Sequence, residues 1–184
     1  MRVLVVYESS YGNTHLIADA IGEALATDAE VDVVPVAKAA RELVERADLV
    51  VIGGPTHAHG MSREQTRHSA VETAHKPGSD LALDPDAEGA GLREWFSTLG
   101  SVTASAAAFD TRIDAPALIT GRASKGISRQ LRRHGFHEIA EPMSFLVTKT
   151  NKLADGQLAA ARKWGELLTG TMATVRAGAG PSNG

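Results

Sequence analysis

The feature that most constrains this chain is an apolar run at residues 3–6, followed at once by a polar loop at residues 7–14 that reads YESSYGNT. Beyond the loop, apolar residues recur at helical spacing as far as Leu25, so the pattern predicts a buried strand, a tight loop and an amphipathic helix. The first backbone N–H groups of such a helix point into the loop, where the positive end of the helix dipole favours an anion. The sequence therefore predicts an anion site at this strand-to-helix junction.

The side chains of the loop favour phosphate as the anion. The hydroxyl groups of Ser9, Ser10 and Thr14 can hydrogen-bond phosphate oxygens, and Gly12 allows a positive φ and a close approach of the backbone. The loop contains no Lys or Arg, so neutral donors and the helix dipole would hold the phosphate. The alternative is that the Ser and Thr side chains only cap the helix.

Two common nucleotide-binding motifs are absent. The nearest approach to G-x-x-x-x-G-K-[ST] lies at residues 121–126, which Ile127 and Ser128 follow, so the lysine is missing. No G-x-G-x-x-G follows the first strand. The sequence therefore argues against a general nucleoside triphosphate or dinucleotide site.

Residues 5–21 carry the pattern V-V-Y-x-S-x-x-G-x-T-x-x-x-A-x-x-I, which resembles the signature of the flavodoxin family. The resemblance implies that this loop holds the 5′-phosphate of FMN without a basic side chain. It also implies three FMN-contacting loops at the carboxyl ends of strands. In the first loop the implied contacts are Ser9, Ser10, Tyr11, Gly12, Asn13 and Thr14.

The second implied loop follows the apolar run at residues 49–52 and reads GGPTHAHGM from residue 53. Its Pro-Thr-x-x-x-Gly pattern resembles the loop of flavodoxin-like quinone reductases, which implies contact with one side of the isoalloxazine ring. The implied contacts are Pro55, Thr56, His57, Ala58, His59 and Gly60.

The ring-stacking candidates in this second loop are His57 and His59, where flavodoxins commonly have Trp or Tyr. An imidazole, above all a protonated one, favours negative charge on the reduced flavin, so we expect a less negative reduction potential. One alternative is that both histidines lie in a surface loop without a role. A metal site is the other, although no carboxylate or cysteine accompanies them at ligand spacing.

The third implied loop ends a strand predicted at residues 102–109 and comprises Phe109, Asp110, Thr111 and Arg112. The tyrosine that the family usually stacks on the ring is absent, and Phe109 is the only aromatic residue nearby; its alternative role is in the strand core. We expect Asp110 to meet the pyrimidine edge of the ring and Arg112 its N1–C2=O end. The alternative is that these two side chains pair with each other.

Strands that alternate with helices predict an α/β fold with a doubly wound parallel sheet, whose ligands bind outside the carboxyl ends of the strands. The strands are predicted at residues 3–6, 31–36, 49–52, 102–109 and 139–147, with Pro142 as a possible interruption of the last. The resemblance implies a flavodoxin-like three-layer sandwich with a five-stranded parallel sheet in the order 2-1-3-4-5.

We expect one FMN-binding domain at residues 1–170, with a long Pro/Gly/Asp-rich surface loop at 75–91, and a disordered C-terminal tail at 171–184. The absence of cysteine excludes disulfides, thiolate catalysis and iron–sulfur clusters. A net charge of −3 argues against nucleic acid as a partner. Because there is neither a signal peptide nor an apolar run of membrane-spanning length, we expect a cytoplasmic protein.

Residues 115–137 contain no carboxylate but five basic residues, which are Arg122, Lys125, Arg129, Arg132 and Arg133. The basic side of a helix is usually just solvated, and the alternative is a docking site for an acidic redox partner. Flavodoxins present acidic rims to basic partners, so this stretch departs from the simple shuttle.

The sequence thus predicts an FMN-binding electron-transfer protein that passes electrons singly between a reductase and an acceptor, as a monomer or weak homodimer. No general acid, base, nucleophile or metal site stands out. The alternative is an FMN-dependent oxidoreductase of the quinone-reductase or porphyrinogen-oxidase type, acting on a small quinone-like substrate. A receiver domain without cofactor would need an acidic pair after the first strand, and only Glu8 is present.

Overall fold

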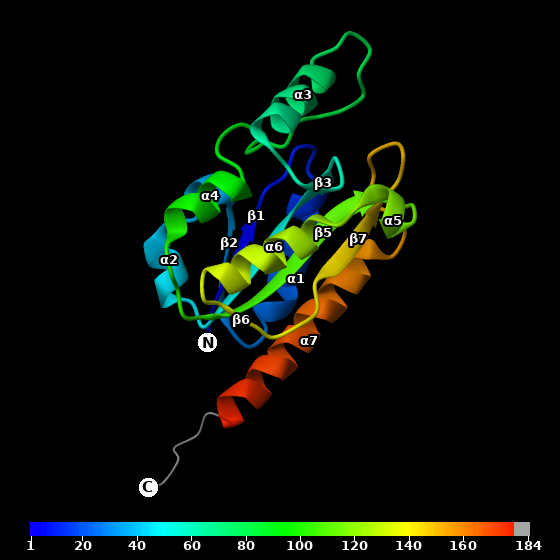
Figure 1. Ribbon diagram of the computed structural model, residues 1–184. Helices are drawn as coiled ribbons and strands as arrows, with labels where there is room; N and C mark the ends of the chain where they lie inside the picture. Colours follow the sequence, from blue (N-terminus) through cyan, green and yellow to red (C-terminus); the bar gives the residue numbers. More distant parts are fainter. Residues whose placement is uncertain (179–184) are drawn as a thin grey trace, which may run out of the picture.

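The computed structural model describes residues 1–178, in which one sheet carries helices on both faces (Figure 1). The strands are β1 (Arg2–Tyr7), β2 (Glu30–Pro35), β3 (Leu49–His57), β4 (Gly60–Met61), β5 (Ser105–Ile113), β6 (His137–Glu138) and β7 (Met143–Val147). The helices are α1 (Asn13–Leu25), α2 (Arg41–Arg46), α3 (Glu64–Ala74), α4 (Leu92–Leu99), α5 (Ala117–Thr120), α6 (Ala123–Arg133) and α7 (Gln157–Gly178), with a 3₁₀ turn η1 (Val36–Lys38).

The central strands are parallel, in the order β2-β1-β3-β5, and both β6 and β7 pair with β5 in parallel on its far side. The predicted fifth strand is therefore divided. Pairing stops between Glu138 and Met143, around Pro142, whose ring nitrogen has no hydrogen to donate to a ladder. The short β4 turns back antiparallel onto the end of β3. The predicted doubly wound, flavodoxin-like fold is confirmed.

Side chains of the central strands alternate between two apolar cores. In β1, Leu4 and Val6 belong to the core shared with α4 and α6, whereas Val3 and Val5 belong to the core shared with α1 and α7. Because successive side chains of a strand point to opposite faces, a strand covered on both faces reads as an unbroken apolar run. Helices α1 and α7 pack side by side on their face of the sheet (Figure 1).

Phe109 is a core residue rather than a ring contact, which corrects one predicted site residue. Its ring is fully buried and meets the rings of Phe145 and Trp164 edge-on, at centroid distances of 6.0 and 6.3 Å. A Cβ on Gly53 of the neighbouring strand would fall on this ring, so glycine at that position makes room for Phe109. The strand-core role that the sequence left open is the one observed.

The last helix, α7, runs past residue 170, the expected end of the domain. It continues to Gly178, and Met172 is buried in the core beside α1, so residues 171–178 of the predicted tail are helical. The rest of that tail, 179–184, lies outside the described residues. Within residues 1–178, no helix combines the length and the apolar character needed to cross a membrane.

Candidate functional site

A hollow of about 230 Å³ lies at the carboxyl edge of the sheet, where four segments distant in sequence meet. Its walls come from the first loop, the end of β3, the end of β5 and the segment after β7. The lining residues are Ser9, Ser10, Tyr11, Asn13, Thr14, Pro55, Thr56, His57, Thr111, Arg112, Ile113, Val147 and Asn151. The three predicted segments thus contribute to one site.

Helix α1 begins at this hollow without a side-chain cap. Its N-cap residue is Gly12, which has a left-handed φ of 88°, and no side chain accepts a hydrogen bond from the first turn. The hydroxyl of Ser9 instead accepts the N–H of Gly12 at 3.1 Å, which holds the loop before the helix starts. The alternative in which Ser and Thr cap the helix is therefore wrong, and the first N–H groups of α1 are free to meet an anion.

The first loop is fixed to two other walls of the hollow by hydrogen bonds. The hydroxyls of Thr14 and Thr111 lie 2.7 Å apart, and both residues are buried. The side-chain amide of Asn13 donates to the backbone O and to Oδ1 of Asn151, each at 3.1 Å. These contacts order the neutral donors of the loop before any ligand binds.

Asn151 is a site residue that sequence reasoning missed. It has a left-handed φ of 58°, a conformation that Asn adopts more readily than most side chains. The available signal was topological: the turn after the fifth strand must also lie at the carboxyl edge, so its polar residues face the same ligand site as the other strand ends.

At the end of β3, Pro55, Thr56 and His57 line the hollow as predicted. Burial lowers the pKa of His57 below its usual value of 6.5, and the negative charge of Glu8 counteracts this only in part. The imidazole is therefore neutral near pH 7. This differs from the protonated imidazole that would raise the flavin potential most.

The remaining residues of the second predicted loop form a hairpin turn beside the hollow rather than its wall. Ala58 and His59 are the two central residues of the turn between β3 and β4, with φ values of 44° and 70°. Such a turn favours Gly or Asn, so two side chains with positive φ mark local strain. His59 and Gly60 line a different hollow on the far side of this turn.

The third predicted loop is strand rather than loop. β5 continues to Ile113 because its residues keep parallel pairing with β3 as far as Thr111 and with β7 as far as Ile113. Thr111 and Arg112 line the hollow. The guanidinium of Arg112 donates to the carbonyl of Ala115 at 2.6 Å, and its buried Nε has no partner.

Asp110 lies behind the hollow, which corrects a second predicted contact. It is fully buried, and its Oδ2 accepts the N–H of Ser124 in the first turn of α6 at 2.7 Å. A carboxylate there is favoured by the helix dipole. Asp110 and Arg112 do not form an ion pair, so the pairing alternative is wrong as well.

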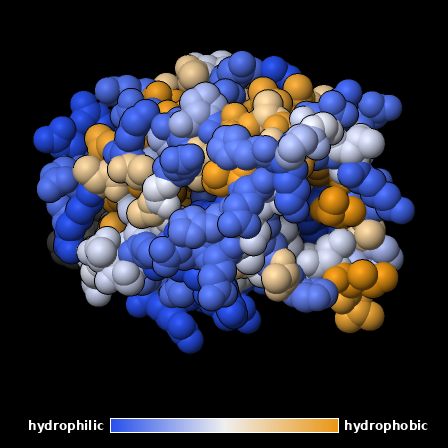
Figure 2. All heavy atoms as spheres, turned by 90° about the horizontal axis from the view of Figure 1, so that it is seen from above, coloured by the Kyte–Doolittle hydropathy of each residue, from blue (hydrophilic) through white to orange (hydrophobic). Residues whose placement is uncertain are grey.

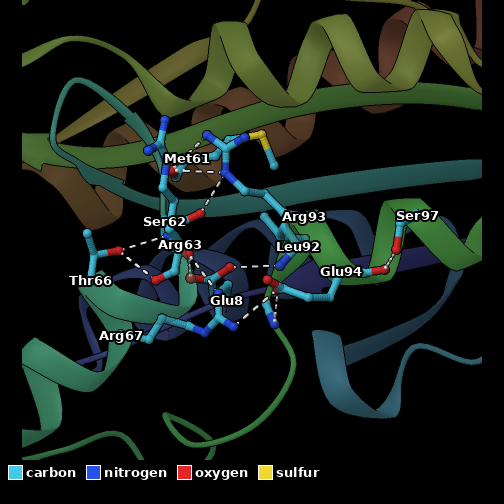
Figure 3. Close-up of polar contacts among 11 residues, drawn as sticks. Glu8, Met61, Ser62, Arg63, Thr66, Arg67, Leu92, Arg93, Glu94 and Ser97 are labelled. Carbon is cyan, nitrogen blue, oxygen red and sulfur yellow. Dashed lines mark hydrogen bonds and ion pairs between the residues drawn. The ribbon is translucent and has the colours of Figure 1, made fainter.

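A buried polar cluster beside the first loop connects it to α3 and α4 (Figure 3). The carboxylate of Glu8 accepts the N–H of Leu92 at 2.8 Å and the hydroxyl of Ser62. The buried guanidinium of Arg67 pairs with Glu94 at 3.1 Å. Since each buried charge has a partner, the cluster fixes the point at which the chain enters α4.

The long loop at residues 75–91 is attached to the back of the first loop. Asp84 donates its N–H to the carbonyl of Ser10 at 2.9 Å, and its carboxylate lies 3.0 Å from Nδ1 of His15. Nε2 of His15 lies 3.0 Å from the hydroxyl of Tyr7, whose pKa burial raises well above its usual range. None of residues 75–91, all of which the structure describes, lines the hollow.

Comparison with known proteins agrees with this architecture. Residues 4–73 match the family model described as a flavodoxin domain. A flavodoxin from the domain Archaea is 19% identical with a TM-score of 0.65, covering 94% of this chain and 99% of that one. Oxidised Flavodoxin 1 from Bacillus cereus is 16% identical with a TM-score of 0.63, covering 92% and 98%. No curated protein matches the chain in sequence.

A more divergent structural neighbour is the flavodoxin, WrbA-like protein from Agrobacterium tumefaciens, which is 19% identical with a TM-score of 0.54 and covers 94% of this chain and 98% of that one. The fold and the hollow define a doubly wound α/β protein with a polar hollow at the carboxyl ends of its strands. The shared fold, together with the match of residues 4–73 to a flavodoxin domain, shows that its fold is flavodoxin-like.

Proposed function

We propose that this chain binds FMN in the hollow at the carboxyl edge of its sheet and carries single electrons between a reductase and an acceptor protein. The observation that carries the proposal is the uncapped N-terminus of α1, which opens into a hollow lined with neutral hydroxyl and amide groups. These donors suit a phosphate monoester that is bound without a basic side chain.

The residues at the phosphate end fit the group. Ser9, Thr14 and Asn13 supply polar side chains around the first turn of α1, and all three line the hollow. Gly12 completes the cradle because its left-handed φ would strain any other residue. The dipole of the 13-residue helix adds partial positive charge at the same point.

The ring end also fits an aromatic heterocycle with polar edges. Pro55, His57 and Tyr11 supply apolar or aromatic surface, and the unpartnered Nε of Arg112 offers a donor to a ring carbonyl. FMN, when bound, supplies the redox chemistry, and the protein supplies position and electrostatics. The neutral His57 and the charged Arg112 would tune the potential from the hollow's walls.

The second candidate function is an FMN-dependent oxidoreductase acting on a quinone-like or porphyrinogen substrate. It is favoured by the pattern Pro-Thr-x-x-x-Gly at residues 55–60, of which Pro55 and Thr56 line the hollow. The WrbA-like structural neighbour has the same fold, which is consistent with this second candidate function. A carrier oxidises NAD(P)H slowly when alone, whereas an oxidoreductase turns over NAD(P)H with a quinone.

Two measurements test these functions. The absorbance spectrum of the purified chain with added FMN should show a bound oxidised flavin. A colourless protein that gives no heat with FMN in calorimetry would contradict the proposal. If flavin binds, steady-state oxidation of NAD(P)H with and without a quinone separates the two functions. Multiple turnovers with quinone would favour the oxidoreductase over the carrier.

A further inference from the structure

A second hollow, of about 350 Å³, lies on the opposite side of the β3–β4 turn from the FMN site proposed above. Four of its lining residues are arginines, contributed by α4, the start of α6 and the body of α6. The lining residues are His59, Gly60, Met61, Arg93, Arg122, Gly126, Arg129, Gln130 and Arg133. No carboxylate lines it.

A third hollow, of about 560 Å³, adjoins the second because Arg122 and Arg129 line both. It adds Lys125 and Arg132 of α6, and it also contains the carboxylates of Glu138 and Glu141. We call the combined surface the arginine face. Its members are Arg93, Arg122, Lys125, Arg129, Arg132 and Arg133.

The positive charge of the arginine face is largely uncompensated. Arg132 pairs with Glu138, but Lys125, Arg129 and Arg133 are exposed and have no ion-pair partner among residues 1–178. Because these three residues follow one another at i, i+4 spacing on α6, their mutual repulsion weakens the helix. Their arrangement is therefore not explained by the stability of α6.

The guanidinium groups of Arg93 and Arg122 also form no ion pair with a carboxylate in the described part of the chain. Arg93 donates to the carbonyls of Met61 and Ser62, at 3.1 and 2.8 Å. Arg122 donates to the hydroxyl of Ser144 and to the carbonyl of Pro142. These contacts orient the two groups but leave their charge in place.

An exposed apolar patch borders the arginine face. Leu118 and Ile119 on α5 are 96% and 65% exposed, the largest values among the exposed large apolar side chains of the described residues. Gly121, directly after α5, bridges to His59 in the β3–β4 turn. Figure 2, which looks down on the carboxyl edge, shows hydrophobic side chains at the right-hand rim, the side on which Figure 1 places α5.

The location links this surface to the proposed redox site. The β3–β4 turn separates the FMN hollow, lined by His57, from the arginine-lined hollow, lined by His59 and Gly60. A partner seated on the arginine face would therefore lie against the wall of the cofactor site. The net charge of the chain is −3, so only a local interaction would attract an anionic partner to this edge.

We propose that the arginine face, together with Leu118 and Ile119, is the docking surface for an acidic redox protein. The proposal rests on FMN binding in the adjacent hollow. A surface of arginines beside exposed apolar side chains has the composition of a protein interface, in which arginine is enriched. Nucleic acid fits less well, because Leu118 and Ile119 offer nothing to phosphates and the chain as a whole is negative.

The electrostatic part of the proposal is tested with small redox reagents of opposite charge. The FMN-loaded chain is reduced and mixed in stopped flow with ferricyanide, a trianion, or with hexaamminecobalt(III), a trication, at low and at high ionic strength. We expect the rate with ferricyanide to fall by about tenfold as salt rises, because steering by a local charge has this size. The opposite salt dependence, which the net charge alone predicts, would overturn the proposal.

The charge-reversal variant Arg129→Glu/Arg133→Glu should reverse the salt dependence. Arg46→Glu/Lys163→Glu is the matched control, since both side chains are exposed and neither lies on the arginine face. The control should keep the salt dependence of the wild type. If both variants behave alike, net charge and not the arginine face controls the reaction, and the proposal fails.

Protein binding is measured separately, with an acidic plant-type ferredoxin, a basic cytochrome c and a short DNA duplex as immobilised probes. We expect retention at low salt by ferredoxin alone, and loss of retention in Arg129→Glu/Arg133→Glu but not in the control. Preferential binding to cytochrome c or to DNA would contradict the proposal. Because this readout needs no flavin, it remains informative if the chain does not bind FMN.

Discussion

The two hollows beside the β3–β4 turn differ in chemistry although they share one edge of the sheet. The hollow on the β1 side is small and is lined by hydroxyls, amides, apolar side chains and one imidazole, with Arg112 as its single arginine. The hollow on the α6 side is lined by four arginines and no carboxylate. Most of the arginines therefore lie outside the hollow in which the N-terminus of α1 would hold an anion most tightly.

The reason for this difference is physical. A helix N-terminus with uncapped N–H groups binds an anion at short range and in a fixed orientation. Solvent-exposed arginines attract anions at long range but fix their position less well. We therefore interpret the first hollow as a site that positions a cofactor and the second as a surface that attracts a partner. The following predictions test this division.

The largest effect is expected from Thr14→Ala. The buried hydroxyl of Thr14 would be lost as a donor to the phosphate, and hydrogen bonds to charged groups contribute about 1.5–3 kcal/mol, so affinity for FMN should fall by roughly 10- to 100-fold. Quenching of flavin fluorescence measures the affinity. Riboflavin, which has no phosphate, should bind wild type and variant equally.

Two controls sharpen this result. Thr14→Ser keeps the hydroxyl and should retain FMN affinity. Thr73→Ala removes a hydroxyl that donates to the carbonyl of Ser69 within α3, away from the hollow, and should change nothing. Equal losses for FMN and riboflavin in Thr14→Ala would mean that Thr14 supports the fold of the loop rather than the phosphate.

Arg112→Gln should have the next largest effect, on the reduction potential. Arg112 is the one cationic residue that lines the first hollow, so its loss removes positive charge from beside a flavin that becomes more negative on reduction. We expect a potential lower by about 60 mV, the value of a tenfold change for one electron. Arg129→Gln, on the other side of the turn, is the control and should shift the potential much less.

His57→Gln should change the pH dependence of stability. Because burial lowers the pKa of His57 in the folded state, the unfolded state binds more protons below about pH 6.5. The free energy of unfolding of the wild type should therefore decrease as the pH falls from 6.5, by at most about 1.4 kcal/mol per pH unit from this group. Urea denaturation at pH 6.5 and at a lower pH should show a smaller decrease in the free energy of unfolding for the variant than for the wild type. An equal decrease would mean that His57 titrates normally.

The smallest effect is expected from Arg129→Gln on stability. The substitution relieves repulsion from Lys125 and Arg133 at i±4, so the free energy of unfolding should rise by roughly 0.2–0.5 kcal/mol per pair relieved. Chemical denaturation measures the free energy of unfolding. Arg132→Gln is the contrast: because Arg132 pairs with Glu138, this variant should be less stable than the wild type. A loss of stability in Arg129→Gln would show that this arginine has a structural partner.

The sequence allowed the fold and most of the first hollow to be predicted because these depend on local patterns. The strand–loop–helix unit at residues 3–25 follows from the hydrophobic periodicity of the sequence. Phe109 and Asp110 were misplaced for a different reason. Both lie in a strand whose end is set by pairing with β7, and no local signal reports that pairing.

The two halves of the chain also differ in how far family resemblance reaches. The family match ends at residue 73, whereas the fold match extends over most of the chain. The contact from Asn151 and the arginine face lie in the second half, where tertiary packing brings together segments that share no motif. Composition indicated the basic helix, but only the structure shows that it borders the β3–β4 turn at the carboxyl edge of the sheet.

The phosphorus NMR spectrum of bound FMN tests the central claim most directly, because it reports on the phosphate in the cradle at residues 9–14. A free phosphate monoester gains a proton with a pKa of about 6, and its resonance moves accordingly. In a buried cradle of neutral donors, the resonance of bound FMN should stay constant as the pH passes through this value. A resonance that titrates like that of free FMN would contradict the account.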